Sequence, residues 1–354
     1  MSTRIAIVCP IASGGGITEA FFNSLEMLQR EGATPIAIVP EQFRFLERLE
    51  ATDLEHHTIK GLERGGTWNF LLQTRRLRQA IKRTKPDILV LNNGRHVAAQ
   101  KRANPGLPIV AIYHGGKTQR YAKADRIITI NDDQRGYMIS MGYPADRVVV
   151  VDNALPLETL PPYVARQSRA NPPTVGTLRL LEPAKGIDTL IEAIAELAGR
   201  GLRLETRIGS NGSQKEKLIA LAKRLGVQDL VHFDGWIEDK DAYFDAMDIY
   251  VLPSRAEEWG IGVVEANAAR LPVIATNTLG PKRIVEHDVT GLLVPKEDPA
   301  AMADAIAAVA SDTELAERLA KAGYERCAER YLLPKIAPIF FHEITHVLTK
   351  EKSK

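Results

Sequence analysis

The sequence predicts an α/β protein made of two Rossmann-like, doubly wound domains. Short runs rich in Ile and Val alternate with helical patterns along the chain, and one Pro-rich stretch interrupts this alternation near the middle. Near-continuous apolar runs are typical of parallel strands buried on both faces, and their alternation with helices indicates βαβ units. The length of 354 residues also fits two domains.

The first half of the chain supplies six predicted strands. Helical periodicity in this half is clearest over residues 17–31 and 68–84. We therefore expect an N-terminal Rossmann-like domain over residues 1–158. The strands follow the Ile/Val-rich runs at residues 4–9, 34–40, 87–91, 109–113, 126–130 and 148–151.

The alternation restarts after a Pro-rich segment. Five prolines between residues 153 and 173 resist both helix and central strand. We interpret residues 159–172 as a linker, residues 173–333 as a second Rossmann-like domain, and residues 334–354 as a helix that returns to the first. Two such domains imply a cleft, and ligands bind outside the carboxyl ends of the strands. Predicted strands of the second domain lie at 174–178, 204–208, 230–233, 249–252, 273–275 and 291–294, and helices at 187–198, 213–225, 261–270 and 299–310.

Composition excludes several classes of protein. Cys9 and Cys327 lie far apart, so we expect neither a disulfide framework nor a structural zinc site. No apolar run approaches the ~18 residues of a membrane span, and the N-terminus lacks the layout of a signal peptide, so a cytoplasmic location is expected.

The two halves of the chain differ in charge. Residues 1–160 carry 21 basic and 16 acidic residues, whereas the rest carry 25 basic and 28 acidic residues. The first half is therefore the better candidate for an anionic partner, and we expect no nucleic acid.

The segment 254–265 carries the first candidate site. It follows a predicted strand and opens a predicted helix, and Gly260 and Gly262 allow a ligand to approach the backbone closely. Free N–H groups at a helix start favour phosphate. Glu257 and Glu265 would repel phosphate but can accept hydrogen bonds from sugar hydroxyls. The combination suits a sugar nucleotide; the alternative is that both carboxylates are solvated charges.

Arg179 and Lys185 flank a turn after the first strand of the second half. An Arg fork and a Lys point charge together suit a diphosphate, although two surface cations would look the same.

The segment Ser13-Gly14-Gly15-Gly16 follows the first strand and lacks the GxGxxG spacing. It lets a ligand approach the helix start, or it is a plain tight turn.

His114 stands at the carboxyl end of a predicted strand, the edge of the sheet at which ligands bind. Its position alone is compatible with either a functional or a structural histidine.

At Glu257 and Glu265 the chain resembles glycosyltransferase family 4, whose members carry a Glu-x7-Glu pattern. Residues 266–276 and 280–295 resemble the same family. Two departures are Ala269-Arg270, where the family has a small residue and a glycine, and Arg179, which lies three residues after Gly176 instead of directly after it. The resemblance implies the GT-B fold, with two Rossmann-like domains facing a cleft, and transfer of a sugar with retention of anomeric configuration.

The resemblance also implies a role for each candidate residue. Arg179 and Lys185 would bind the diphosphate, Glu265 the ribose and Glu257 the donor sugar. His114 would contact the sugar from the opposite domain. Trp236 could cover the base or be a core aromatic. Further donor-binding positions are implied at Gly15, Gly16, Gly209, Trp236, Ile237, Trp259, Gly260, Ile261 and Gly262.

The implied donor is a UDP-, GDP- or ADP-sugar, and the implied acceptor is a hydroxyl of a glycan or lipid-linked glycan of the cell-envelope polysaccharide or lipopolysaccharide type. We expect no metal or other cofactor, because Arg179, Lys185 and backbone N–H groups can stabilise the leaving diphosphate. Two alternatives stay open. One is a sugar-nucleotide epimerase or hydrolase on the same fold, and the other is a non-catalytic sugar-nucleotide binding protein.

Residues 70–85 form a basic helical stretch. One interpretation is a buried apolar stripe made by Leu71, Leu72, Leu77 and Ile81 with a solvated basic face opposite. The other is peripheral contact with anionic lipid headgroups on the inner face of a membrane. The basic residues are Arg75, Arg76, Arg78, Lys82, Arg83 and Lys85.

Overall fold

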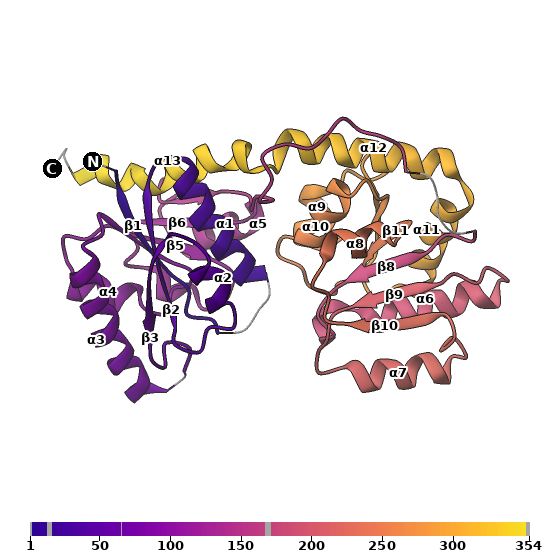
Figure 1. Ribbon diagram of the computed structural model, residues 1–354, viewed down its shortest axis with the longest axis horizontal. Helices are drawn as coiled ribbons and strands as arrows, with labels where there is room; N and C mark the ends of the chain where they lie inside the picture. Colours follow the sequence, from indigo (N-terminus) through magenta and orange to yellow (C-terminus); the bar gives the residue numbers. More distant parts are fainter. Residues whose placement is uncertain (1, 13–15, 65, 167–170, 352–354) are drawn as a thin grey trace. The chain divides into compact units, whose positions relative to one another are not determined.

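Residues 2–12, 16–64, 66–166 and 171–351 are described by the computed structural model. The chain divides into two units (Figure 1). Unit 1 comprises Met1–Glu158 and Leu332–Lys354, and unit 2 comprises Thr159–Tyr331. Each unit is an α/β structure around one parallel sheet, so the predicted fold class is confirmed.

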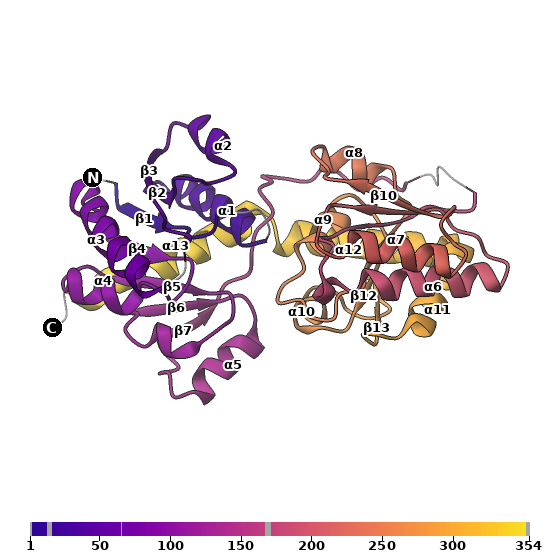
Figure 2. The same cartoon turned by 90° about the horizontal axis from the view of Figure 1, so that it is seen from below.

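Unit 1 contains a seven-stranded sheet in the order β3-β2-β1-β4-β5-β6-β7. All neighbouring strands are parallel, and β3 and β7 lie at the two edges (Figure 2). Strand β3 was not predicted, because its sequence Glu-His-His-Thr-Ile contains no run of apolar residues. An edge strand pairs on one side only and tolerates polar residues. The strands are β1 (Arg4–Val8), β2 (Thr34–Pro40), β3 (Glu55–Ile59), β4 (Ile88–Leu91), β5 (Ile109–Tyr113), β6 (Arg126–Thr129) and β7 (Val148–Val150).

Helices cover both faces of this sheet because successive side chains of a strand point to opposite faces. In β1, Ile5 and Ile7 pack in one core cluster with α1 and α13, whereas Ala6 and Val8 pack in the other with α3 and α4. The final helix α13 therefore completes unit 1. The helices are α1 (Gly16–Arg30), α2 (Leu46–Glu50), α3 (Thr67–Thr84), α4 (Val97–Ala103), α5 (Asp132–Ser140) and α13 (Leu333–Glu351), with a 3₁₀ turn η1 (Thr118–Tyr121).

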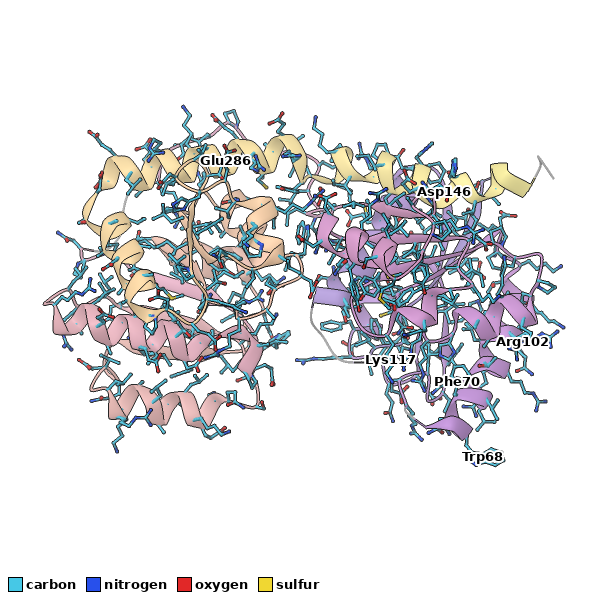
Figure 3. All side chains as sticks on the ribbon, turned by 180° about the vertical axis from the view of Figure 1, so that it is seen from behind. Trp68, Phe70, Arg102, Lys117, Asp146 and Glu286 are labelled. Carbon is cyan, nitrogen blue, oxygen red and sulfur yellow. The ribbon has the colours of Figure 1, made fainter. Side chains whose placement is uncertain are left out.

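Helix α3 corrects one sequence-based expectation. Leu77 and Ile81 are buried, but Leu71 and Leu72 are 57% and 48% exposed and do not belong to the buried stripe. Trp68, in the first turn of α3, is 82% exposed and projects from the end of the helix (Figure 3). The buried face of α3 is narrower than the periodicity suggested, and its first turns present apolar side chains to solvent.

Unit 2 contains a six-stranded parallel sheet in the order β10-β9-β8-β11-β12-β13. The order reverses between β8 and β11, which is the topological switch point of a doubly wound sheet. Val251 of β11 packs in the core with α6 and α11, whereas the adjacent Tyr250 faces α9. The strands are β8 (Val175–Leu178), β9 (Thr206–Gly209), β10 (Val231–Gly235), β11 (Ile249–Leu252), β12 (Val273–Thr276) and β13 (Leu292–Val294).

The helices of unit 2 begin where side chains can cap them. Asp239, Asp298 and Asp312 each accept a hydrogen bond from a backbone N–H in the first turn of α8, α11 and α12. The helices are α6 (Ile187–Gly199), α7 (Lys215–Arg224), α8 (Lys240–Asp245), α9 (Ile261–Ala268), α10 (Leu279–Ile284), α11 (Pro299–Ser311) and α12 (Thr313–Arg330), with a 3₁₀ turn η2 (Pro183–Lys185).

Much of the Pro-rich segment packs on unit 2. The ring of Tyr163 lies edge-on to Tyr324 at 5.4 Å, and the Tyr324 hydroxyl donates to the carbonyl of Pro161. Arg166 forms an ion pair with Asp245 at 3.1 Å. Residues 159–166 are thus held by contacts with the unit to which they belong.

Candidate functional site

The candidate site of unit 2 lies at the carboxyl ends of β8 and β11, beside the switch point. Arg179 follows β8 directly, and its backbone N–H donates to the carbonyl of Gly209 at 3.1 Å. Glu257 lies in the loop between β11 and α9. Parallel pairing of β8 and β11 therefore brings together two side chains that are 78 residues apart in the sequence.

The Glu257 carboxylate contacts both candidate cations. Its Oε2 accepts a hydrogen bond from the Arg179 guanidinium and lies 3.0 Å from the Lys185 Nζ. Arg179 also donates to the Ser254 hydroxyl at 3.3 Å, and Arg179 and Glu257 are largely buried. The sequence predicted that the two cations converge on one anion; in the structure that anion is a carboxylate of the protein itself.

A tight contact between two loops positions Lys185. Gly186 has a φ of +63°, and a Cβ there would lie 2.1 Å from the carbonyl oxygen of Pro253. The backbone N–H of Arg255 donates to the Ala184 carbonyl at 2.9 Å. These contacts hold the end of η2 against the loop after β11, so Lys185 reaches Glu257.

The Arg255 side chain reinforces the same contact between the two loops. Its guanidinium forms two hydrogen bonds of 2.8 Å with Asp188, in the first turn of α6, and one of 2.9 Å with Glu297. A bidentate Arg–carboxylate pair fixes geometry as well as charge. Sequence reasoning missed Arg255 as a positioning residue, because Asp188 and Glu297 are distant from it in sequence.

Burial changes the ionisation of the cations. Burial, together with the neighbouring charge of Arg179, lowers the pKa of Lys185 to about 8. Burial also lowers the pKa of Arg179, but an arginine stays charged in proteins. Lys185 is therefore the group in this cluster whose charge is lost at mildly alkaline pH.

A second ion pair involves Glu265 on α9. Its Oε1 lies 2.9 Å from the Nζ of Lys240, the first residue of α8. Lys240 was not among the predicted site residues. It lies between Asp239 and Asp241, and the Asp239 carboxylate caps α8. Among the described residues, no group of three or more His, Cys, Asp or Glu side chains is arranged to hold a metal ion.

The glycines at the start of α9 permit close packing. Gly260 has a φ of +95°, and a Cβ on Gly262 would lie 2.2 Å from the Tyr250 hydroxyl. Trp259 and Ile261 flank Gly260. The Trp259 indole is 3% exposed and packs edge-on to Tyr331 at 6.0 Å, so the side chain is part of the core. Only the backbone of Trp259 is therefore in a position to contact a ligand.

Gly209 and the segment after β10 form the neighbouring part of the sheet edge. A Cβ on Gly209 would lie 2.9 Å from side-chain atoms of Ile237, Leu178 and Tyr243, so a larger residue would have to displace these side chains. Trp236 is 42% exposed and is therefore not a core residue.

In unit 1, His114 follows β5 directly. Its Nε2 lies 3.4 Å from the Asn92 Oδ1, at the end of the adjacent strand β4. Burial lowers the pKa of His114 to about 4, so the ring is neutral at pH 7. Gly16 begins α1, and a Cβ there would meet nothing within 4 Å. Gly15 lies outside the residues that the structure describes.

Two sequence profiles match adjacent parts of the chain. Residues 14–159 match the profile described as Glycosyltransferase Family 4, and residues 165–326 match that described as Glycosyl transferases group 1. The chain is a member of glycosyltransferase family 4.

Curated relatives of this family 4 protein include bacterial glycosyltransferases. The D-inositol 3-phosphate glycosyltransferase of Frankia alni is 33% identical over 232 residues, which cover 60% of this chain and 57% of that protein. The chain thus spans a little over half the length of that relative. The lipopolysaccharide core biosynthesis glycosyltransferase LpsD of Rhizobium meliloti is 27% identical over 90% of this chain and 91% of its own length.

Solved structures show the same fold. A glycosyltransferase of Rickettsia africae has a TM-score of 0.85 at 18% identity, covering 98% of this chain and 99% of that chain. Anabaena Alr3699/HepE, solved in complex with UDP and glucose, has a TM-score of 0.81 at 18% identity with the same coverage. The family 4 protein therefore has the predicted GT-B fold. Within the described residues, none of its helices combines the length and apolar character needed to span a membrane.

Proposed function

We propose that this protein transfers a glycosyl group from a nucleoside-diphosphate sugar to a hydroxyl of a glycan or lipid-linked glycan, with retention of anomeric configuration. The observation that carries the proposal is the contact of one Glu257 oxygen with both Arg179 and Lys185 at the sheet edge. Two cations that share one protein carboxylate can exchange it for the oxygens of a diphosphate. Family membership and the complex of the Anabaena neighbour with UDP and glucose support this choice of donor.

The chemistry follows from these contacts. When the bond between the anomeric carbon and the diphosphate breaks, negative charge develops on the departing oxygen. Arg179 and Lys185 stabilise that charge, so the reaction needs no metal ion. Glu257, released from the cations, accepts hydrogen bonds from the donor-sugar hydroxyls, and Glu265 accepts them from the ribose. The neutral His114 ring offers the sugar a hydrogen bond rather than a positive charge.

A panel of UDP-, GDP- and ADP-sugars tests this function. A matched donor raises the melting temperature by mass action. Nucleotide release is then measured with and without candidate acceptors. Release that increases with an acceptor indicates a transferase; release without an acceptor indicates a hydrolase. A thermal shift without release indicates an epimerase or a binding protein, and product analysis separates these two. No thermal shift and no release with any donor would contradict the proposal.

The pH dependence of donor use follows from Lys185. Because its pKa is lowered to about 8, its positive charge is present below that value and is lost as the pH rises through it. We expect kcat/KM for the donor to fall above about pH 8. The Lys185→Arg variant keeps its charge, so its decline should be absent or shifted to higher pH. If kcat/KM depends on pH in the same way in the parent and in Lys185→Arg, a group other than Lys185 causes the decline.

We also propose that the exposed face of α3 contacts an anionic membrane surface. Trp68, Leu71 and Leu72 are exposed in its first turns, and exposed basic residues follow on the same face at the spacing of helical turns. Apolar side chains beside cations are typical of helices that lie in the headgroup region. The basic residues of this face are Arg75, Arg78, Lys82 and Arg83.

Sedimentation with vesicles tests this contact. We expect the protein to bind vesicles containing an anionic lipid and to bind zwitterionic vesicles weakly. The Leu71→Ser/Leu72→Ser variant should reduce binding by about tenfold, because each leucine buries apolar area on insertion. Ile219→Ser, which changes a 44% exposed residue of α7, is the control. Equal binding by both variants would place the contact elsewhere.

A further inference from the structure

Helix α13, the last helix of the chain (Figure 1), carries a motif that lies outside the candidate donor site. Residues 342–346 read His-Glu-Ile-Thr-His, which places two histidines at positions i and i+4. Residues with this spacing lie on the same face of a helix, one turn apart. The H-E-x-x-H spacing on a helix therefore allows two imidazoles to hold one metal ion.

The two histidine rings lie close enough to share an ion. The centres of the His342 and His346 rings are 5.8 Å apart, and the ring planes are tilted by 45°. Two imidazoles that bind one ion at about 2.0 Å with a tetrahedral angle have ring centres about 5 Å apart. A small rotation of the two side chains is therefore enough to bring both nitrogens onto one ion.

The histidine pair faces away from the core of unit 1. Phe340, Ile344 and Val347 form the buried face of this part of α13 and pack in the core cluster that includes β1 and α1. His342 is exposed and His346 is half-buried. Both histidines are therefore in contact with solvent, from which an ion can bind.

Glu343, the acidic residue of the motif, is held by another part of unit 1. Its Oε2 accepts a hydrogen bond from the guanidinium of Arg126 on β6, and both side chains are largely buried. In metalloproteases with this motif the glutamate is the general base. Because the Glu343 carboxylate is engaged by a buried cation, the motif of α13 offers two metal ligands and no free base.

We propose that His342 and His346 bind one divalent transition-metal ion, of the class Zn²⁺, Ni²⁺ and Cu²⁺, on the surface of unit 1. Imidazole suits these ions, whereas Mg²⁺ and Ca²⁺ favour oxygen ligands. Among the described residues no third His, Cys, Asp or Glu side chain completes the set, so the remaining coordination positions are open to water. This site does not depend on the proposed transferase function.

Calorimetric titration with Zn²⁺ tests the site on protein that carries no affinity tag. We expect one ion to bind per chain. His342→Gln and His346→Gln should each lower the affinity by at least about tenfold, which is the cost of losing even an outer-shell partner of a metal ligand. Cu²⁺ should bind more tightly than Zn²⁺, and Mg²⁺ should not bind at the pair. A parent protein that binds no Zn²⁺ would overturn the proposal.

The matched control removes two other histidines from the same unit. His56 and His57 are adjacent on β3, where successive side chains point to opposite faces of the sheet, so they cannot hold one ion together. The His56→Gln/His57→Gln variant should therefore keep the parental Zn²⁺ affinity. If this variant loses as much affinity as His342→Gln does, the assignment to α13 is wrong.

Two measurements test the number of ligands. Electron paramagnetic resonance of the Cu²⁺-loaded parent should show coupling to two nitrogen ligands, and coupling to one would overturn the assignment. Glu343→Gln removes the charge that pairs with Arg126, so we expect a lower melting temperature and an unchanged Zn²⁺ affinity. A folded Glu343→Gln protein that loses as much affinity as His342→Gln would make Glu343 a ligand and overturn the two-imidazole site.

Discussion

Replacing Lys185 with alanine is expected to lower donor-dependent nucleotide release by about 100- to 1000-fold, the cost of losing one preorganised group that stabilises a developing negative charge. Lys185 reaches the Glu257 carboxylate at 3.0 Å and would transfer that contact to the leaving diphosphate. The measurement is kcat/KM for the donor identified in the panel, with the melting temperature recorded in parallel.

Two further variants make this result specific. Lys223→Ala removes an exposed lysine at the end of α7 and should leave kcat/KM unchanged. Lys185→Arg keeps the charge and should lose less activity than Lys185→Ala. Because Glu257 retains Arg179 as a partner, the alanine variant should fold normally. If the Lys185→Ala protein releases nucleotide at the parental rate, the assigned diphosphate site is wrong.

Gly186→Ala is expected to destabilise unit 2 by about 3 kcal/mol, from left-handed backbone strain and from a Cβ forced against a neighbouring backbone. Gly186 has a φ of +63°, and its Cβ would lie 2.1 Å from the Pro253 carbonyl oxygen. Urea unfolding followed by tryptophan fluorescence measures this change, since Trp259 is buried in unit 2.

The control is Gly199→Ala, at the end of α6, where an added Cβ meets nothing within 4 Å. Alanine favours a helix, so this variant should be as stable as the parent or slightly more so. Gly186→Asn separates the two causes, because asparagine tolerates a left-handed backbone but still carries a Cβ. If Gly186→Asn is as stable as the parent, the contact with Pro253 is not the constraint.

Sequence patterns place Arg179 and Glu257 at one edge of the predicted sheet, whereas the roles of these residues toward a donor stay predictions. Each of the two residues follows a strand of a parallel sheet, whose strands end at one edge, and the resemblance to family 4 implies their roles toward the donor. The structure places them in direct contact. Sequence could not predict that Glu257 itself holds both cations. That contact depends on the path of the 183–186 turn, which Gly186 allows to approach Pro253.

Other features depended on long-range packing. Lys240 pairs with Glu265, and Arg255 with Asp188, across 25 and 67 residues respectively. No local pattern marks such partners, because lysines and arginines are frequent along the whole chain. Trp259 was expected near the donor, but its side chain is in the core. An aromatic residue beside two glycines looks the same in sequence whether it faces a ligand or a neighbouring helix.

The sequence by itself determined two parallel α/β units and the loops that carry the candidate donor residues, because apolar periodicity fixes strands and helices locally and parallel strands align their carboxyl ends. Only the tertiary structure decided which charges meet and which apolar side chains stay exposed. Leu71 and Leu72 have the same character as Leu77, yet only Leu77 is covered, because helical periodicity places both leucines away from the face of α3 that buries Gln73, Leu77 and Ile81. Ion pairs and solvent exposure are set by neighbours distant in sequence, and these neighbours exist only once the units have folded.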